Sequence, residues 1–341
     1  MGIEKLQKLQ KKVYHLCGSP SSNFFFELSL IYSRNVICPS GWNQSFIVVD
    51  PDYNWFYGDA LSSLDPQDPI EIITSLSKDA LIVPHMFCKR GMTLYRSFFN
   101  EQLGFSMVGS TADVMKKSID KNLSRNLVSQ NNVTVAPGEL LRQGCKPKIP
   151  YPIIVKPNSE DNSSGVSLVR EEAKLESALK IAYEFDSEVL IEAFIPGREL
   201  RVAVIELEND FYIPSIIEYP VSEMLPIRMV SDKLELNENG LPNSQAKNSK
   251  IAPKCPAEIE PVLLKTIRDQ AIRAHQALGA RHYSLFDFRL DSRTGQVVFL
   301  EAGLFWSFSD VSMISTMINK DGRSLETIID NVWTTALGLK T

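Results

Sequence analysis

Long hydrophobic runs are absent from this sequence of 341 residues. No stretch approaches the roughly 18 consecutive apolar residues that a membrane-spanning helix needs. The N-terminal stretch carries lysines at positions 5, 8, 11 and 12 and has no apolar segment of the signal-peptide type. We therefore expect no membrane association, no secretion signal and a cytoplasmic location.

Cysteine, histidine and excess positive charge are also scarce. The 5 cysteines form no Cys-x-x-Cys pair, which is typical of free thiols in a reducing compartment. Lys and Arg number 36 against 41 Asp and Glu, a net charge of −5 without a basic stripe. This balance excludes a general nucleic-acid binder, so we expect small-molecule partners. The apolar content of 44% is ample for one large or several smaller domains.

The N-terminal part has the pattern of an open α/β sheet. A β-like run over 13–16 leads through a Gly/Ser turn into a helical pattern over 24–32, which is typical of a Rossmann-like unit. An apolar strand over 80–84 is followed by His85 and Arg90. Ligands of such sheets bind beyond the carboxyl ends of the strands. His85 and Arg90 are therefore candidate substrate contacts, with surface decoration as the alternative.

The stretch from Tyr151 to Arg201 contains the strongest chemical signal. Lys156 ends the apolar run Ile153-Ile154-Val155, and burying an unpaired ammonium costs several kcal/mol, so it must face an anion. The turn that follows contains Ser163, Ser164 and Gly165. Small residues of this kind let backbone N–H groups approach an oxyanion closely. The pattern predicts a binding site for an oxyanion.

Two acidic residues near the C-terminus form a candidate metal site. The strands 284–291 and 297–301 are joined by a Thr-Gly turn, which predicts a hairpin that brings Asp287 close to Glu301. Converging carboxylates repel unless a cation joins them. Mg²⁺ takes one or two carboxylates together with phosphate oxygens. We predict a magnesium site, with a simple salt-bridged pair as the alternative.

Together Lys156-Pro157, the Ser-Ser-Gly turn and the segment Glu192-x-Phe-Ile-x-Gly-x-Glu199 resemble the nucleotide site of ATP-grasp ligases. The chain is most similar to the D-alanine–D-alanine ligase branch, from about Gly109 to the C-terminus. The resemblance implies a mixed α/β fold. Its expected domains are a Rossmann-like domain over 1–111, a central ATP-grasp lobe over 112–191 and a C-terminal lobe over 192–341 with a lid at 221–253.

The same resemblance implies ATP and Mg²⁺ as cofactors, with Mn²⁺ as a substitute, and assigns roles to individual residues. Phosphate contacts are implied for Lys121, Lys156, Ser163, Ser164, Gly165 and one of the lid lysines Lys247 and Lys250. Adenosine contacts are implied for Glu192, the backbones of Ala193 and Ile195, and Glu199. The metal ligands are Asp287 and Glu301, and the second amino acid is held by Ser312 with Met313. The catalytic set is Lys156, Ser163 and Arg289.

Several positions depart from the branch pattern. Gly303 stands where a metal-ligating Asn is usual, and Leu285 stands where an Arg is usual, with Arg289 as a candidate substitute. The aromatic residues Trp306 and Phe308 replace a Pro-Gly loop, and they either pack in a core or line a bulkier first substrate. The N-terminal Glu-Arg pair that helps to hold D-alanine is missing. These departures imply that the first substrate is not D-alanine.

The whole pattern is similar to cyanobacterial ligases of mycosporine-like amino acid biosynthesis, including the start Cys17-Gly18-Ser19-Pro20 and the segment 304–309. That resemblance implies the joining of serine or threonine to mycosporine-glycine. Two alternatives stay open: a D-alanyl or L-amino-acid dipeptide ligase, and a non-catalytic nucleotide-binding module. Family members are often dimers, so a homodimer is an open alternative to a monomer.

Overall fold

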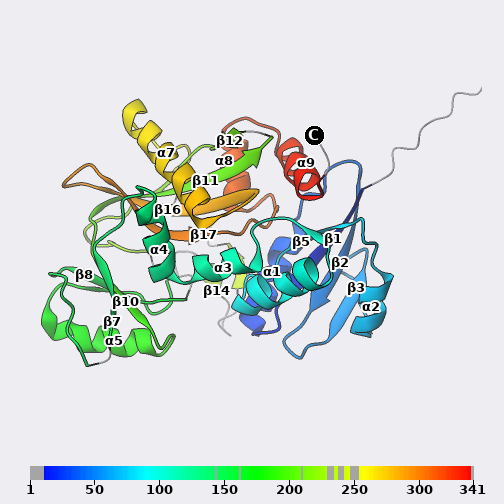
Figure 1. Cartoon of the computed structure of the whole chain (residues 1–341), viewed down its shortest axis with the longest axis horizontal. Coiled ribbons are helices and arrows are strands. Elements are labelled where there is room, and N and C mark those ends of the chain that lie inside the picture. The colour runs from blue at the N-terminus through cyan, green and yellow to red at the C-terminus, as the bar shows by residue number, and fades with distance from the viewer. Residues whose placement is uncertain are drawn as a thin grey trace, which may run out of the picture. The chain divides into compact units, whose positions relative to one another are not determined.

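The computed structural model describes residues 11–142, 144–160, 163–208, 210–228, 234–236, 242–245 and 253–338. These residues form two compact units (Figure 1). Unit 1 contains the described residues up to Val108 together with Ser307–Ser315 and those from Ser324 onward, and unit 2 contains Gly109–Trp306 and Thr316–Arg323. Residues 307–315 and 324–338 therefore belong with the N-terminal part, whereas the predicted lobe boundary at 191 stays a prediction.

Unit 1 is built on a six-stranded sheet in the order β4-β3-β2-β1-β5-β6. Strand β1 (Lys11–Gly18) pairs in parallel with β2 (Trp42–Val49) and β5 (Leu81–Pro84). Helix α1 (Asn23–Arg34) follows β1 and is capped by Ser22, so the predicted strand–turn–helix is confirmed. The other elements of this unit are β3 (Trp55–Gly58), β4 (Pro66–Gln67), α2 (Pro69–Ser75), η1 (Gly91–Tyr95), η2 (Phe98–Gln102), β6 (Ser106–Met107) and α9 (Leu325–Ala336).

The turn after β1 depends on a glycine. Gly18 has φ +86°, and a Cβ there would lie 2.2 Å from the carbonyl oxygen of Val49 on the neighbouring strand. Only glycine allows this backbone conformation and this close approach together. The C-terminal helix α9 is tied to the start of the same sheet, because Asp330 accepts hydrogen bonds from Lys11 Nζ (3.2 Å) and Trp42 Nε1 (2.7 Å).

The first sheet of unit 2 has four antiparallel strands in the order β7-β10-β8-β9. Alternate residues of β8 (Ile153–Pro157) and β10 (Val189–Ala193) pack in a core with α5 (Leu175–Tyr183), which lies along the sheet (Figure 1). Because side chains alternate between the two faces of a strand, Lys156 and Glu192 project from the opposite face. The remaining elements of this lobe are β7 (Gly138–Leu141), β9 (Ser167–Val169) and η3 (Glu172–Lys174).

The second sheet of unit 2 is centred on β11 (Gly197–Leu207) and β16 (Tyr283–Asp291), which are antiparallel. Strand β17 (Val297–Gly303) pairs with β16 and completes the predicted hairpin. Helix α7 (Pro261–Leu278) ends at Gly279 in the left-handed conformation (φ 69°), which glycine adopts readily at the end of a helix. Strands β12 (Asp210–Tyr212) and β13 (Ile217–Tyr219) pair with β11, and β14 (Leu234–Leu236) and β15 (Pro242–Gln245) form a separate two-stranded sheet. Helix α8 (Met313–Lys320) begins in unit 1 and continues in unit 2.

The stretch 112–130 contains two helices. The pattern over 112–130 reads as a single helix, but the structure has α3 (Ala112–Ile119) and α4 (Lys121–Gln130). Asp120 separates them in an extended conformation, and its side chain accepts a hydrogen bond from the Leu123 N–H. A short carboxylate that caps a helix start in this way competes with continuation of the previous helix. The break places Lys121 at the first turn of α4.

None of the helices in the described part of the chain has both the length and the apolar character required to cross a bilayer. All five cysteines are free thiols.

Candidate functional site

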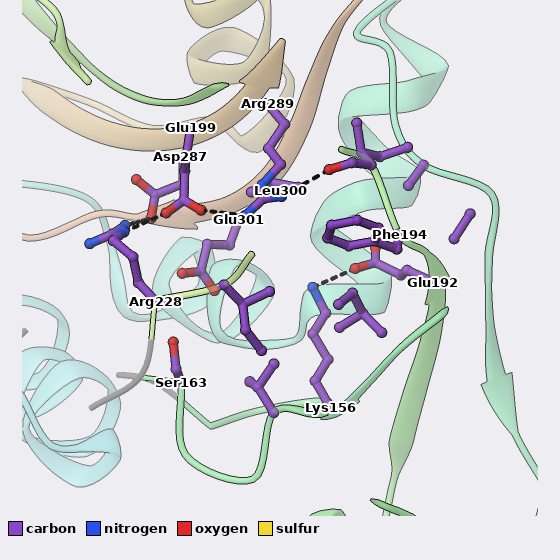
Figure 2. A pocket seen from close by; sticks show the side chains of 16 residues that line it. Lys156, Ser163, Glu192, Phe194, Glu199, Arg228, Asp287, Arg289, Leu300 and Glu301 are labelled. Carbon is purple, nitrogen blue, oxygen red and sulfur yellow. Dashed lines mark hydrogen bonds and ion pairs between the residues drawn. The ribbon is translucent and has the colours of Figure 1, made fainter. Parts of the chain in front are cut away.

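A pocket in unit 2 is lined from its four-stranded and its five-stranded sheet. Lys156 and Ser163 project from one side, and Glu199, Asp287 and Glu301 project from the other (Figure 2). Arg228 and Arg289 complete the charged lining. The apolar part of the wall is made by Ala136, Ile154, Val166, Ala193, Phe194, Ile195, Ile227 and Leu300. A pocket with one apolar wall and a group of convergent charges suits a flat base attached to an anionic group.

Lys156 faces a protein carboxylate. Its Nζ lies 2.5 Å from Glu192, and Arg125 Nε lies 3.2 Å from the same carboxylate. All three side chains are buried, with exposed fractions of 7–9%. A buried ammonium requires an anion nearby, and Glu192 is the anion beside Lys156. The roles of Lys156 toward phosphate and of Glu192 toward adenine stay predictions.

Glu199 is held by two arginines. Its carboxylate accepts from Arg228 Nε at 2.5 Å and from Arg289 Nη2 at 2.9 Å. Burial would raise the pKa of Glu199, but the two guanidinium groups outweigh burial and hold the pKa below its usual value. Arg289 also donates to the carbonyls of Ile195 (2.9 Å) and Pro226 (2.5 Å). Arg289 is thus built into the wall beside Glu199, and its predicted catalytic role stays a prediction.

The two predicted metal ligands lie on neighbouring strands. Asp287 and Glu301 are direct partners in the antiparallel register, at the point where a bulge shifts the pairing of β16 and β17. Arg201 donates to both oxygens of Asp287 at 2.6 Å, and Arg228 Nη2 lies 3.6 Å from it. Burial lowers the pKa of Arg201, but attraction by Asp287 and other groups, Glu301 included, raises it well above the usual value.

These residues fit a magnesium ion that brings its own anionic ligands. No group of three or more His, Cys, Asp or Glu suited to a metal occurs among the residues that the structure describes. Two carboxylates in register are the number that Mg²⁺ uses when phosphate oxygens and waters fill its other positions. The oxygens of Asp287 are satisfied by guanidinium groups, which supply the positive charge that two adjacent carboxylates require.

The small polar turn is where the sequence predicts it. Ser163 has φ 63° and lines the pocket, and Gly165 has φ 71° with Pro157 2.7 Å from where a Cβ would be. The Val166 N–H donates back to the Ser163 carbonyl at 3.4 Å, which closes a tight turn that includes Ser164. Lys121 is buried and donates to the carbonyl of Glu160, just before this turn. The lid lysines Lys247 and Lys250 lie outside the described residues.

The segment between the two sheets forms the apolar wall of the pocket. The Ala193 N–H donates to the Pro137 carbonyl at 2.8 Å, and the Ile195 carbonyl accepts from Arg289. The predicted adenine contacts would therefore fall to the other two groups, the Ala193 carbonyl and the Ile195 N–H. Phe194, the middle residue of this segment, has the guanidinium of Arg289 5.4 Å from its ring centre.

Other predicted residues lie in unit 1, and the structure does not place them relative to the pocket. His85 is buried, with Nε2 2.9 Å from His15 Nδ1, and Arg90 contacts the Tyr53 hydroxyl. Ser312 accepts from the Ser315 N–H at 3.2 Å at the start of α8, next to Met313.

The aromatic segment is divided between two cores. Trp306 is 2% exposed and packs edge-on against Tyr283 in unit 2, whereas Phe308 is fully buried and packs against Trp333 in unit 1. This burial matches the core-packing alternative, and a contact with substrate stays a prediction.

Three arginines of the site are absent from the sequence-based prediction. Arg201 had a usable signal, because it lies two residues after Glu199 and so shares its face of the strand. Arg125 lies on α4 and Arg228 in the predicted lid segment, and neither position has a local pattern that marks it. Each is recognised only through its partner, Glu192 or Glu199.

Comparison with known proteins agrees with this geometry. Residues 125–334 match the family model described as D-ala D-ala ligase C-terminus. The chain is 30% identical over 216 residues to a D-alanine–D-alanine ligase of Citrifermentans bemidjiense, covering 63% of this chain and 65% of the relative. It is 30% identical over 232 residues to one from Pelodictyon phaeoclathratiforme, covering 64% and 60%. The chain thus spans less than two thirds of the length of these relatives.

Solved structures share the fold over nearly the whole chain. The VanG D-Ala:D-Ser ligase of Enterococcus faecalis aligns with a TM-score of 0.77 at 21% identity, covering 96% of this chain and 99% of its own. A D-alanine–D-alanine ligase of Bacillus anthracis complexed with ATP aligns with a TM-score of 0.70 at 17% identity, covering 96% and 97%. These likenesses confirm the predicted mixed α/β fold class. With the family match over residues 125–334, they show that this chain belongs to the D-ala D-ala ligase C-terminus family.

Proposed function

We propose that this chain is an ATP-dependent ligase that forms a C–N bond with an amino acid as the attacking amine. The observation that carries the proposal is the register of Asp287 with Glu301 in the same pocket as Lys156. The same pocket thus contains two carboxylates suited to a divalent cation and a lysine suited to a phosphate. The family model described as D-ala D-ala ligase C-terminus matches residues 125–334, which include these three residues.

In the proposed reaction the γ-phosphoryl group of ATP moves to an oxygen of the first substrate. The amine of the second substrate then attacks the activated carbon, and phosphate leaves with that oxygen while the amine loses a proton. Mg²⁺, held by Asp287 and Glu301, would neutralise phosphate charge during the transfer. Lys156 and the N–H groups of the 163–165 turn hold the phosphates, and Glu199 accepts from the ribose hydroxyls.

The comparisons favour an amino acid carboxylate as the first oxygen-bearing substrate, which makes dipeptide ligation the leading candidate. Named relatives and structural neighbours are D-alanine–D-alanine or D-Ala:D-Ser ligases. The burial of Trp306 and Phe308 also supports it, because it weakens the argument for a bulky aromatic-lined substrate site.

The second candidate, ligation of serine or threonine to mycosporine-glycine, has one observation in its favour. Leu285 and Gly303 are partners in the register beside Asp287 and Glu301. Neither position therefore provides the cationic or amide side chain that the resemblance to D-alanine ligases implies. A site that lacks both groups is suited to a first substrate other than a simple amino acid.

Phosphate release distinguishes these candidates. The protein is incubated with ATP and Mg²⁺, first with a panel of D- and L-amino acids and then with serine or threonine plus mycosporine-glycine. Release with amino acids alone supports dipeptide ligation, and release only with mycosporine-glycine, with a red-shifted ultraviolet product, supports the second candidate. Asp287→Asn is the inactive control. A lack of release in every mixture would contradict the ligase proposal and leave a non-catalytic nucleotide-binding module.

A further inference from the structure

We propose that Arg201 contacts the terminal phosphate of the bound nucleoside triphosphate and makes the site prefer a triphosphate to a diphosphate. This inference rests on the proposed function and names a residue that the resemblance does not assign. It follows from where Arg201 lies relative to Asp287 and Glu301.

The strand register places Arg201 at the acidic pair. Arg201 is the direct partner of Asp287 across β11 and β16, and Asp287 is the direct partner of Glu301 across β16 and β17. The three residues therefore lie in one row across the sheet, on one face. The guanidinium holds both oxygens of Asp287 at 2.6 Å, through Nε and Nη2. Any phosphate drawn to a cation at Asp287 and Glu301 would arrive next to this group.

The guanidinium of Arg201 has donor capacity left for such a phosphate. Arginine carries five N–H donors, and within the described part of the chain Arg201 uses only Nε and Nη2, both toward Asp287. Its side chain is 18% exposed, against 6% for Asp287. The ring of Tyr219 lies 5.6 Å from its central carbon and limits its orientation. A planar fork fixed by a carboxylate on one edge can receive phosphate oxygens on the other.

The cations that line the pocket are held mainly by other groups: Arg228 Nη2 lies 3.6 Å from Asp287, but its Nε donates to Glu199 at 2.5 Å. Arg289 is bonded to Ile195, Glu199 and Pro226, at the adenosine end of the proposed site. Lys156 is paired with Glu192. A divalent cation bound at Asp287 would compete with Arg201 for the negative charge of that carboxylate. A second anion beside Arg201 then restores the balance of charge, and the terminal phosphate meets that requirement.

The test compares the binding of two nucleotides by isothermal titration calorimetry in the presence of Mg²⁺. The ligands are ADP and a non-hydrolysable ATP analogue, and the proteins are the wild type, Arg201→Met, Arg201→Lys and Arg198→Met. Arg198 is the matched control: it lies on the same strand and makes a two-bond pair with a carboxylate (2.6 and 2.7 Å), but that carboxylate is Glu218 and not a member of the acidic pair Asp287 and Glu301.

Arg201→Met is expected to lower affinity for the ATP analogue about ten- to hundredfold, the loss typical of a hydrogen bond to a charged group, with ADP affinity nearly unchanged. Arg201→Lys keeps the charge at Asp287 and loses the fork, so a smaller loss with the same selectivity is expected. If Arg201→Met does not fold, the two nucleotide affinities are compared in Arg201→Lys instead. An unchanged ratio of the two affinities in a folded Arg201 variant overturns the inference alone. A wild type that binds neither nucleotide overturns the proposed function as well.

Discussion

Glu192 is the shared counter-ion of two buried cations, Lys156 and Arg125. Its carboxylate lies 2.5 Å from Lys156 and 3.2 Å from Arg125, and all three side chains are buried. Glu192→Gln keeps the shape of the side chain and removes its charge. Two buried cations then lose their shared counter-ion. We therefore expect a large loss of stability in unit 2, separate from any effect on nucleotide binding.

The expected magnitude follows from the burial of the triad. Removing one partner of a buried ion pair costs about 3–5 kcal/mol, because the remaining charge is left in a medium that solvates it poorly. In a domain of the size of unit 2, each kcal/mol lowers the melting temperature by roughly 2–4 °C. Glu192→Gln should therefore lower the melting temperature of unit 2 by roughly 6–20 °C. Lys156→Met should cost less, because Glu192 keeps Arg125 as a partner.

Calorimetric melting of the two variants and the wild type measures this difference. The control is Glu172→Gln, which breaks an ion pair with Lys146 whose side chains are 60% and 80% exposed. Exposed pairs contribute at most about 1 kcal/mol, so the control should melt close to the wild type. A Glu192→Gln protein that melts together with the Glu172→Gln control would refute the reasoning that the buried triad requires its carboxylate.

Four further predictions concern both units. Asp287→Asn should reduce phosphate release at least about a hundredfold, because one of two carboxylates for Mg²⁺ is lost, and normal Mg²⁺-dependent turnover would contradict the assignment. Gly197→Ala should prevent stable folding, since φ is 131° and a Cβ would lie 2.0 Å from the Leu290 carbonyl oxygen; Gly295→Ala, with φ 71° and open space, is the control, and equal melting temperatures would disprove this. Trp306→Ala should cost about 3–5 kcal/mol in urea unfolding as a core residue, and a loss below about 1 kcal/mol would argue against core packing. Burial lowers the pKa of His15 from 6.5 to about 3, despite an opposing hydrogen bond between the imidazole and Gln44, so the folded state resists the proton that the unfolded chain binds; the stability of unit 1 should fall as pH drops from 6.5 toward 3, and His15→Phe should reduce this slope.

The acidic hairpin and the polar turn could be predicted from local sequence because short-range geometry sets them. Asp287 and Glu301 are joined by one tight turn, so alternation of side chains along two adjacent strands is enough to bring them together. Ser163 and Gly165 occupy positions with positive φ in the tight turn that the Val166 N–H closes onto the Ser163 carbonyl. In the same way, the left-handed conformation of Gly279 after α7 follows from the helix that precedes it.

The helix break at Asp120 shows the limit of periodicity. The apolar pattern continues across α3 and α4, so a single helix is the natural interpretation. What separates them is a side-chain hydrogen bond to the next helix start together with a contact from the Lys121 N–H to the Asn158 carbonyl (3.0 Å). The second contact joins residues far apart in sequence, and no local pattern contains it.

The sequence by itself determined which chemical groups this protein can offer: a lysine at the end of a buried strand, a tight polar turn and two carboxylates on neighbouring strands of one hairpin. Only the tertiary structure decided which charges neutralise them. Arg201 reaches Asp287 across a strand pair separated by 86 positions, and Arg228 reaches Glu199 from a segment with no pattern of its own. The physical reason is that a buried charge must find a partner wherever the packed chain places one, and that choice depends on register and burial rather than on neighbouring residues.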